Sequence, residues 1–303
     1  MYAMKTKENT GVFLIIISAI AYALMPIFSV NALEEGTAVS NLLFMRFSTA
    51  ALILWLYIYL RKIPFKTSIK NLIYIIAIAL LGFTIATSTL YTSYKHISSS
   101  IATLILFTHP VFVLIFEKII TKSKVTKRKV LALIITIIGL FIVLYVKEPL
   151  SSKGIIYAFV ASITYGAYCL GLSEKETQKL GGVVVTAYVA TTTSLAMGIQ
   201  CILTDMPLVT TQASTVTSAL LLAFVSTILA SITFYEGLSI VGPSSATLIS
   251  SVEPMFVVLF SAWLLNEVFT MNTILGGLII ILGIVILEYK KKDNKSLPLR
   301  KSS

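Results

Sequence analysis

The sequence repeats itself at an offset of 144 residues, so one structural unit occurs twice in the chain. Between residues 86–116 and residues 230–260, 12 of 31 positions are identical without a gap. The identical positions include Tyr91 and Tyr235, and Pro110 and Pro254. Shared apolarity alone would not bring Tyr and Pro into one register. The repeat therefore predicts two similar halves.

The composition indicates that most of this chain faces lipid. It is 57% hydrophobic and 12% charged, whereas a soluble domain carries about 25% charged residues. A spanning helix needs about 20 mostly apolar residues. We predict an all-α membrane protein with ten transmembrane helices, and a repeat in such a chain is typical of a transporter. The predicted spans are 11–30, 38–60, 72–94, 100–120, 130–146, 154–172, 183–203, 216–238, 245–265 and 273–289.

The basic residues predict the orientation of these spans, because Lys and Arg concentrate in cytoplasmic loops. With the N-terminus inside, the cytoplasmic stretches hold 20 of the 24 basic residues. The external stretches hold only Lys95, Lys147 and Lys153, and Arg46 lies within a span. We therefore predict a multi-pass protein of a bacterial inner membrane with both termini in the cytoplasm.

Five spans in each half mean that the second half enters the membrane from the opposite side. The two repeats are thus inverted, and their symmetry provides two states of similar energy, as alternating access requires. The predicted organisation is a cytoplasmic tail at 1–10, a first repeat at 11–146, an external linker at 147–153, a second repeat at 154–289 and a basic cytoplasmic tail at 290–303.

The composition and the absence of known motifs argue against several classes of function. The net charge of +11 is spread over separate loops, so it does not indicate nucleic-acid binding. The chain has no Walker-type, H-E-x-x-H or G-x-S-x-G motif, so we expect neither an enzyme nor a cofactor. Cys169 and Cys201 both lie in predicted spans, where they are expected to pack. The expected partners are a small-molecule substrate and the lipid bilayer, with the protein a monomer or homodimer.

The second repeat carries a series of motifs typical of one family. They are Gly242-Pro243-Ser244-Ser245-Ala246-Thr247, Glu253-Pro254, Leu265-Asn266-Glu267, Gly276-Gly277 and Gly283. With the late Gly139 of the first repeat, this pattern resembles the EamA-type permeases of the drug/metabolite transporter superfamily over about residues 11–289. The first repeat departs from it, with His109-Pro110 for Glu253-Pro254 and Ser123 for Glu267. The resemblance implies export of amino acids, other small metabolites or toxic compounds.

Glu253 and His109 occupy equivalent positions in the two repeats, near the middle of their predicted spans. Ionisable groups within a span are costly and mark functional sites by default. Glu253 is a candidate proton-coupling and substrate-binding residue; the alternative is a permanently protonated carboxyl bonded to a neighbouring helix. His109 could titrate or donate a hydrogen bond to substrate; the alternative is a neutral imidazole satisfied by Ser or Thr. One His and one Glu make a poor metal site.

Each of these residues is followed by a proline, Pro110 or Pro254. A proline has no N–H and frees the carbonyl four residues earlier, which kinks the helix. These carbonyls belong to Leu106 and Ser250. Paired interruptions in corresponding spans point to the substrate site of a transporter. We therefore predict hinges at both prolines, although packing alone could also explain them.

Arg46 is a candidate for gripping a substrate carboxylate in bidentate fashion. The alternative is a side chain that extends outward or pairs with Glu34 or Glu35. Acidic substrates would make Arg46 essential for transport, whereas cationic substrates would make it dispensable.

Small residues also recur on one face of the third and eighth spans, at i, i+4, i+7 and i+11. This spacing is compatible with close helix packing or with a cavity wall. Tyrosines offer an aromatic face with a polar tip and are further candidates. The substrate-binding candidates on these grounds are Thr89, Tyr91, Thr233, Tyr235, Tyr22 and Tyr165.

Together these patterns predict a secondary transporter that exports amino acids or related small metabolites, with Glu253 as a site for protons. One alternative is a multidrug or lipophilic-cation exporter in which Glu253 holds the cation. Another is a membrane protein without transport activity, such as a scaffold or an intramembrane enzyme. A channel is less consistent, because no carbonyl-rich filter sequence is apparent.

Overall fold

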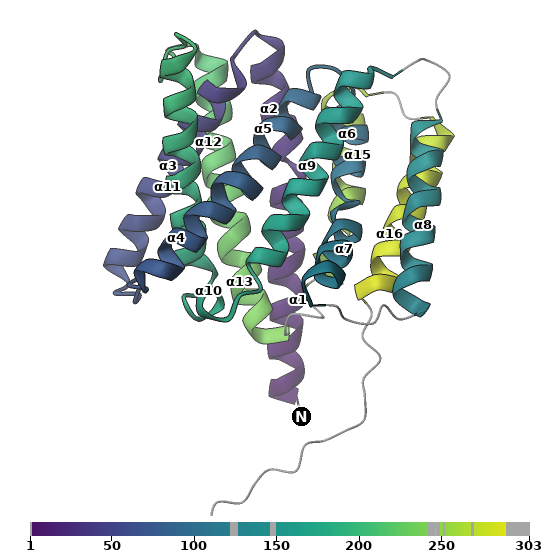
Figure 1. Cartoon of the computed structure of the whole chain (residues 1–303), viewed down its shortest axis with the longest axis horizontal. Helices are drawn as coiled ribbons and strands as arrows, with labels where there is room; N and C mark the ends of the chain where they lie inside the picture. The colour runs from purple at the N-terminus through teal and green to yellow at the C-terminus, as the bar shows by residue number, and fades with distance from the viewer. Residues whose placement is uncertain are drawn as a thin grey trace, which may run out of the picture.

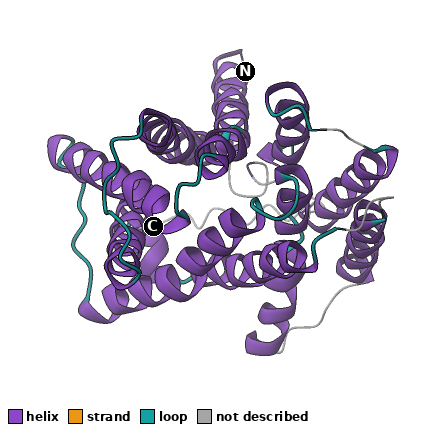
Figure 2. Cartoon of the chain, turned by 90° about the horizontal axis from the view of Figure 1, so that it is seen from above, coloured by secondary structure: helices purple, strands orange, loops and turns teal. Residues whose placement is uncertain are grey.

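The computed structural model describes residues 2–121, 127–145, 150–241, 246, 249–250, 252–267 and 270–288. Throughout these ranges the chain consists of helices and short connections, with no strand (Figure 2). Continuously apolar segments favour helices in lipid, because a helix satisfies its backbone hydrogen bonds internally. The predicted all-α fold is confirmed for this part of the chain.

The first half begins close to the N-terminus and runs to residue 144 (Figure 1). Three of its apolar segments consist of more than one helix. Its helices are α1 (Tyr2–Ala23), α2 (Met25–Glu34), α3 (Val39–Leu60), α4 (Ile69–Ile78), the π-helix η1 (Ala79–Thr84), α5 (Ile85–Ser93), α6 (Ser99–Leu106), α7 (His109–Thr121) and α8 (Lys127–Leu144).

The second half follows a similar plan, with a π-helix in its third long segment as well. Its helices are α9 (Ser152–Gly171), α10 (Lys175–Lys179), α11 (Gly182–Leu203), α12 (Ala213–Ala223), the π-helix η2 (Phe224–Leu229), α13 (Ala230–Val241), α15 (Glu253–Leu264) and α16 (Met271–Glu288).

In the part of the chain that the structure describes, seven helical segments are long and apolar enough to cross a membrane, and each corresponds to a predicted span. The three other predicted spans contain shorter apolar helices, at Val130–Leu144, Glu253–Leu264 and Met271–Ile286. The structure therefore supports a multi-span helical protein, and ten complete spans remain our proposal. The seven segments are Asn9–Glu34, Val39–Leu60, Ile69–Ser93, Ser99–Ile120, Ser152–Gly171, Gly182–Leu203 and Ala213–Leu238.

The predicted N-terminal tail differs from the structure, and the predicted C-terminal tail and part of the linker are not described by it. Helix α1 begins at Tyr2, so the segment expected to be a tail continues the first helix; its Lys and Glu residues are good helix formers. The predicted tail at 290–303 and the linker residues 147–149 lie outside the described residues.

The most extensive helix contacts join the two halves of the chain. They are made by four pairs: α8 with α16, α3 with α11, α1 with α13, and α5 with α9. Exchange of the two repeats maps the first two pairs onto themselves and exchanges the third with the fourth. A two-fold axis relating the repeats produces this pattern, and the equivalent π-helices η1 and η2 fit the same symmetry.

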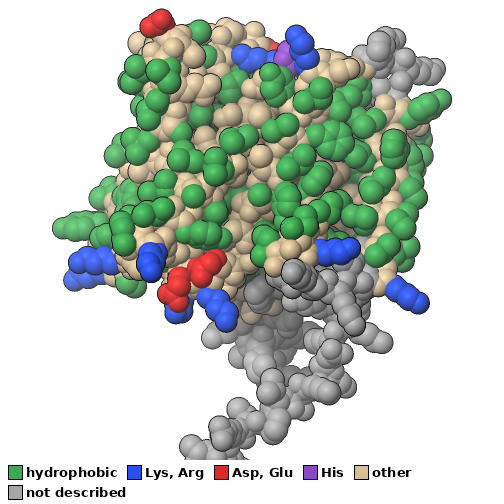
Figure 3. Space-filling view, viewed as in Figure 1, with side chains coloured by type: hydrophobic (Ala, Val, Ile, Leu, Met, Phe, Trp, Pro, Cys, Tyr) green, Lys and Arg blue, Asp and Glu red, His purple; other side chains and the backbone are tan. Residues whose placement is uncertain are grey.

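The clusters of buried apolar residues differ in size between the two ends of the bundle. The largest buried cluster includes Leu33 of α2, Leu43 of α3, Tyr91 of α5 and Ile101 of α6. These residues lie toward the loops that were predicted to be external. Smaller clusters pack the opposite half, for example Leu54 of α3 against Val184 of α11. On the face shown in Figure 3, Lys and Arg side chains gather mainly at the lower end, and apolar side chains cover the middle.

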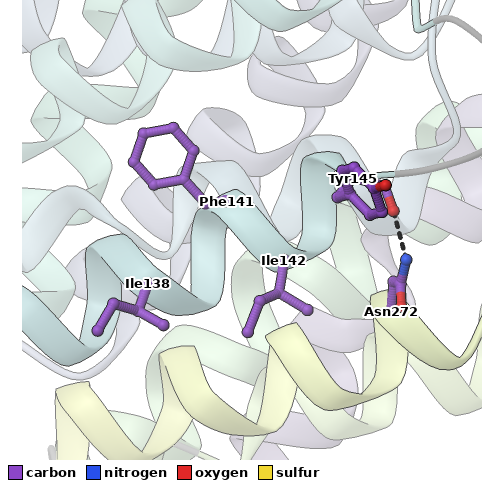
Figure 4. A pocket seen from close by; sticks show the side chains of 5 residues that line it. All are labelled: Ile138, Phe141, Ile142, Tyr145 and Asn272. Atoms are coloured by element: carbon purple, nitrogen blue, oxygen red, sulfur yellow. Dashed lines mark hydrogen bonds between the residues drawn. The ribbon is translucent and has the colours of Figure 1, made fainter.

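A shallow hollow of about 460 Å³ lies on the α8–α16 pair (Figure 4). Ile138, Phe141 and Ile142 form its apolar wall, and the Asn272 side-chain amide donates to the Tyr145 carbonyl at 2.5 Å. None of the predicted site residues lines it. The hollow lies on an outer helix pair, away from the broken helices described next.

Candidate functional site

Two apolar segments break in the middle, and His109 or Glu253 begins the second part. Helix α6 ends at Leu106 and α7 starts at His109. In the other repeat, α15 starts at Glu253 after a turn at Val252. The prolines were expected to kink continuous helices, but at Pro110 the helix is interrupted, because proline cannot donate to the preceding turn. The residues just before Val252 lie partly outside the described ranges.

The carbonyl of Leu106, which Pro110 leaves without its helical donor, is satisfied by side chains instead. His109 Nδ1 lies 3.1 Å from it and the Ser162 hydroxyl donates to it at 3.2 Å. Since a carbonyl only accepts, Nδ1 carries the proton of the neutral His109 ring and Nε2 is the acceptor. The alternative prediction was that a Ser or Thr side chain hydrogen-bonds this imidazole. It is wrong for Nδ1, because the partner of Nδ1 is the Leu106 backbone carbonyl.

Glu253 lies deep among protein atoms and nevertheless keeps part of its surface accessible. Within the described residues, its carboxyl makes no hydrogen bond. Its position in the first turn of α15 places negative charge at the positive end of the helix dipole, which is favourable. A deep, accessible carboxyl without a hydrogen-bond partner has free acceptor sites.

One tyrosine from each repeat lies near this carboxyl. Tyr22 of α1 is close enough to Glu253 and Tyr235 to interact with them electrostatically, and Tyr165 of α9 interacts in the same way with Tyr22 and Glu253. The Tyr22 hydroxyl also lies 3.2 Å from the Ser231 hydroxyl of α13. Tyr22 and Tyr165, which are 143 residues apart in the sequence, thus lie at one location in the bundle.

His109 joins the same group through Tyr165, because their rings meet edge to face with centroids 4.8 Å apart. Tyr168, one turn further along α9, lies 5.9 Å from Tyr165 by centroid and is mostly buried. Sequence reasoning missed Tyr168. Its spacing of three residues from Tyr165 was the available signal, since such residues share a helix face. We call Tyr22, His109, Tyr165, Tyr168, Tyr235 and Glu253 the central cluster.

Tyr235 reaches the central cluster from α13 and packs its ring on the N-terminus of α11. A Cβ on Gly182 would collide with the Tyr235 ring. Its hydroxyl interacts with the Thr186 hydroxyl, which in turn donates to the Gly182 carbonyl at 2.8 Å. Gly182 is required for this close approach of ring and backbone.

Arg46 lies apart from this cluster, buried between the repeats and only 3% exposed. Its Nη1 donates to the Tyr91 hydroxyl at 2.5 Å and its Nε to the Thr227 hydroxyl at 3.0 Å. Its Nη2 lies 3.4 Å from the Ser226 carbonyl. The alternative of a side chain extending outward is wrong, because protein groups hold all three nitrogens. These contacts tie α3 to the π-helix η2 of the other repeat.

The remaining candidates all have hydrogen-bond partners within the protein. Tyr91 is fully buried against Arg46. The Thr89 hydroxyl donates to the Ile85 carbonyl at 2.7 Å, and the Thr233 hydroxyl donates to the Leu229 carbonyl at 2.8 Å. Substrate contact by these three residues stays a prediction.

The small-residue stripe of the eighth span packs closely on α1. The Ser18 hydroxyl donates to the Ala230 carbonyl at 2.8 Å, and the Ser226 hydroxyl donates to the Ala21 carbonyl at 3.0 Å. A Cβ on Gly237 would lie 2.8 Å from the Gly11 carbonyl. Helix packing therefore accounts for this stripe.

Sequence reasoning assigned no role in a site to two further features. The first long segment breaks at Leu24, two residues after Tyr22, with Pro26 in the first turn of α2. Pro26 was the available signal, although position 170 of the other repeat is Leu and α9 runs through it unbroken. The second feature is Glu267, whose carboxylate is hydrogen-bonded to the first turn of α6.

Comparisons with known proteins identify the family of this chain. The model of the EamA-like transporter family matches residues 9–145 and again residues 152–289. A protein of Clostridium kluyveri described as an uncharacterized transporter is 23% identical over 73% of this chain and 73% of its own length. An uncharacterized transporter of Archaeoglobus fulgidus is 23% identical over 83% of this chain and 88% of its own.

A solved crystal structure shares the fold. It superposes with a TM-score of 0.67 at 12% sequence identity, over 92% of this chain and 97% of that one. This identity is too low to carry more than the fold, whereas the two family matches together cover most of the chain. With its two repeats and its family-typical motifs, the chain belongs to the EamA-like transporter family.

Proposed function

We propose that this protein is a secondary transporter that exports amino acids or related small metabolites by alternating access, with the ammonium group of the substrate at Glu253. The observation that carries the proposal is the central cluster. A carboxyl without a hydrogen-bond partner among the described residues lies deep in the bundle, is partly accessible, and has one tyrosine of each repeat near it. A carboxylate next to aromatic faces is suited to a cationic amine.

Proton coupling follows from the same carboxyl. One carboxyl group can hold either a proton or an ammonium ion, since each neutralises its single charge. A proton that enters from outside and binds Glu253 therefore releases the amine, and the reverse occurs on the other side. His109, whose Nε2 is free to accept from a substrate or to take a proton, is the second candidate in this exchange.

We propose that access in the described state is from the cytoplasmic side. The largest buried cluster lies toward the end predicted to be external, while Tyr22, Tyr165, Tyr235, His109 and Glu253 all keep accessible surface. A substrate would thus enter from the end where Lys and Arg gather. With this orientation, we propose that both termini lie in the cytoplasm of an inner membrane.

A lipophilic-cation exporter is the second candidate, and the state of Arg46 favours it. The guanidinium is enclosed by Tyr91, Thr227 and Ser226, so it is not presented to a substrate carboxylate. A substrate that needs only Glu253 and aromatic contacts fits this arrangement without any movement of Arg46.

Flux measurements on purified protein in liposomes separate these possibilities. The panel contains a zwitterionic amino acid, its decarboxylated amine and tetraphenylphosphonium, each with and without an imposed pH gradient. Amino-acid export predicts gradient-driven, saturable flux of the first compound, which Glu253→Gln abolishes. A cation exporter transports the second and third compounds only.

The matched control is Glu34→Gln, which removes one exposed carboxylate at the external end and should leave flux unchanged. If flux of every compound survives Glu253→Gln, the proposed role of Glu253 is wrong and the protein is a facilitator. If no compound moves in wild-type protein, the transport proposal itself fails for these substrate classes.

A further inference from the structure

The carboxylate of Glu267, which follows α15, caps the N-terminus of α6 in the other repeat. Its Oε1 accepts from the backbone N–H of Ser99 at 2.8 Å and from the Ser99 hydroxyl at 2.7 Å. Its Oε2 accepts from the backbone N–H of Ser100 at 3.3 Å and from the Ser100 hydroxyl. The contact joins residues 168 and 167 positions apart in the chain.

The local backbone directs Glu267 to this place. Asn266 has a left-handed conformation, with φ of 53°, which few side chains other than Asn tolerate. This turn returns the Glu267 N–H to the Ser261 carbonyl at 3.2 Å. Ser261 is fully buried and its hydroxyl lies 3.3 Å from the Ser99 hydroxyl. The cap is thus part of the α15–α6 contact.

The surroundings of the cap make it a strong interaction. Ser99 and Ser100 are almost completely buried, so water competes weakly for their donors. Hydrogen bonds to a charged acceptor are about twice as strong as those between neutral groups. The negative charge also lies at the positive end of the α6 dipole. Both carboxylate oxygens are used, so separation of α15 from α6 breaks four hydrogen bonds.

Helix α6 is one part of the broken segment that leads to the central cluster. It ends at Leu106, three residues before His109. In Figure 1, α6 and the adjoining part of α15 lie at the end opposite the N-terminus, whereas α7 lies below. A movement of α6 away from α15 would therefore open the external end above the cluster.

The chain cannot build the same cap at the opposite end. The repeat offset relates Glu267 to Ser123 and Ser99 to Pro243. Serine has no charge to place at a helix N-terminus, and proline has no N–H to donate. Residues 123 and 243 lie outside the described ranges, and the difference between the repeats is one of residue identity. The cap is therefore one-sided although the repeats are symmetric.

We infer that Glu267 is a positioning residue that latches the external end shut, so that the protein without substrate favours the state open to the cytoplasm. The inference rests on the proposed alternating-access function and adds a cause for the bias between its two states. Symmetric repeats alone would make the two states similar in energy. A latch on one side shifts that balance, and substrate binding must offset it before the external end opens.

Thiol labelling tests the latch without any transport measurement. The external reporter is Ala102→Cys, a buried position one turn into α6. The internal reporter is the native Cys169, which is half-buried near Tyr165. The other native thiol is removed by Cys201→Ala, and Cys169→Ser is added for the external reporter. A membrane-impermeant maleimide is applied from one side at a time, without substrate.

Glu267→Gln should raise external labelling at position 102 about tenfold or more and lower cytoplasmic labelling of Cys169. A tenfold change in labelling corresponds to about 1.4 kcal/mol, which is less than the loss of all four hydrogen bonds of the cap would give. Glu34→Gln, also at the external end but exposed, should change neither rate. Ser100→Ala removes one hydroxyl donor and should move both rates in the same directions by a smaller factor.

Opposite changes at the two reporters support the latch. Unchanged labelling in a folded Glu267→Gln protein overturns it, and so does a rise at both ends, which would mean that Glu267 only holds the bundle together. If Glu267→Gln does not fold, the Ser100→Ala result decides by the same criteria. Failure here leaves the transport proposal untouched, whereas absent flux with opposite labelling changes would leave the latch and remove the transport proposal.

Discussion

The backbone of Gly276 in α16 lies directly against the backbone of Gly139 in α8. A Cβ on Gly276 would come within 2.6 Å of the Gly139 carbonyl oxygen, and one on Gly139 within 2.8 Å of the Gly276 carbonyl oxygen. Gly283, one repeat after Gly139, makes an equally close approach to Thr136. These glycines therefore let α8 and α16 pack backbone against backbone.

Gly276→Ala should destabilise the protein, because the added methyl group has no space between two backbones. Overpacking of this kind costs about 1–3 kcal/mol. The measurement is the thermal unfolding midpoint in detergent. Gly277→Ala is the matched control, since its Cβ would meet only the flexible Leu104 side chain at 3.3 Å. Equal midpoints for the two variants would contradict the packing argument.

Tyr91→Phe should destabilise the protein through Arg46. The substitution removes the hydroxyl that accepts from Nη1 at 2.5 Å and leaves a buried charged donor without this partner. Such a loss costs about 1–3 kcal/mol. Tyr94→Phe is the control, because the Tyr94 hydroxyl lies 3.3 Å from the neutral Thr103 hydroxyl. Thermal unfolding of both variants gives the comparison, and a smaller loss for Tyr91→Phe would refute it.

Pro110→Ala should slow transport severalfold without lowering stability. The new N–H can donate to the Leu106 carbonyl, which His109 and Ser162 now satisfy, and the break between α6 and α7 becomes a more continuous helix. Initial flux rates and unfolding midpoints are measured together. Pro64→Ala, in an exposed loop, is the control. Unchanged flux would show that the break is not a hinge.

Cysteine labelling in intact cells should establish the orientation. In a background with Cys169→Ser and Cys201→Ala, the exposed Met206→Cys should react with an impermeant maleimide. The exposed Ser173→Cys should react only after the membrane is disrupted. Both expectations follow from the excess of Lys and Arg on the side of Ser173. The reverse pattern would place the N-terminus outside and invert the direction proposed for the latch.

The course of the helices was predictable, because lipid requires apolar segments of about 20 residues whatever their neighbours are. The predicted span 38–60 corresponds to Val39–Leu60, and 183–203 corresponds to Gly182–Leu203. The internal repeat also predicted equivalent places for His109 and Glu253, and both begin the second part of a broken segment. Local composition and symmetry carry this information.

The partners of the polar side chains could not be predicted in this way. Arg46 was expected to hold a substrate or to extend outward, yet it bonds Thr227, 181 residues away. The turns of η1 and η2 also change the register of their helices, which a pattern of constant periodicity does not anticipate. Such contacts depend on which helix faces are brought together.

The sequence by itself determined a helical membrane protein of two related halves, since hydrophobic length, the 144-residue repeat and the distribution of Lys and Arg are properties of the chain alone. Only the tertiary structure decided that Tyr22, Tyr165 and Glu253 share one location and that Glu267 caps Ser99 and Ser100. The physical reason is that a polar group inside a bundle takes whichever donor or acceptor packing brings to it. Packing across 168 residues leaves no local signal in the sequence.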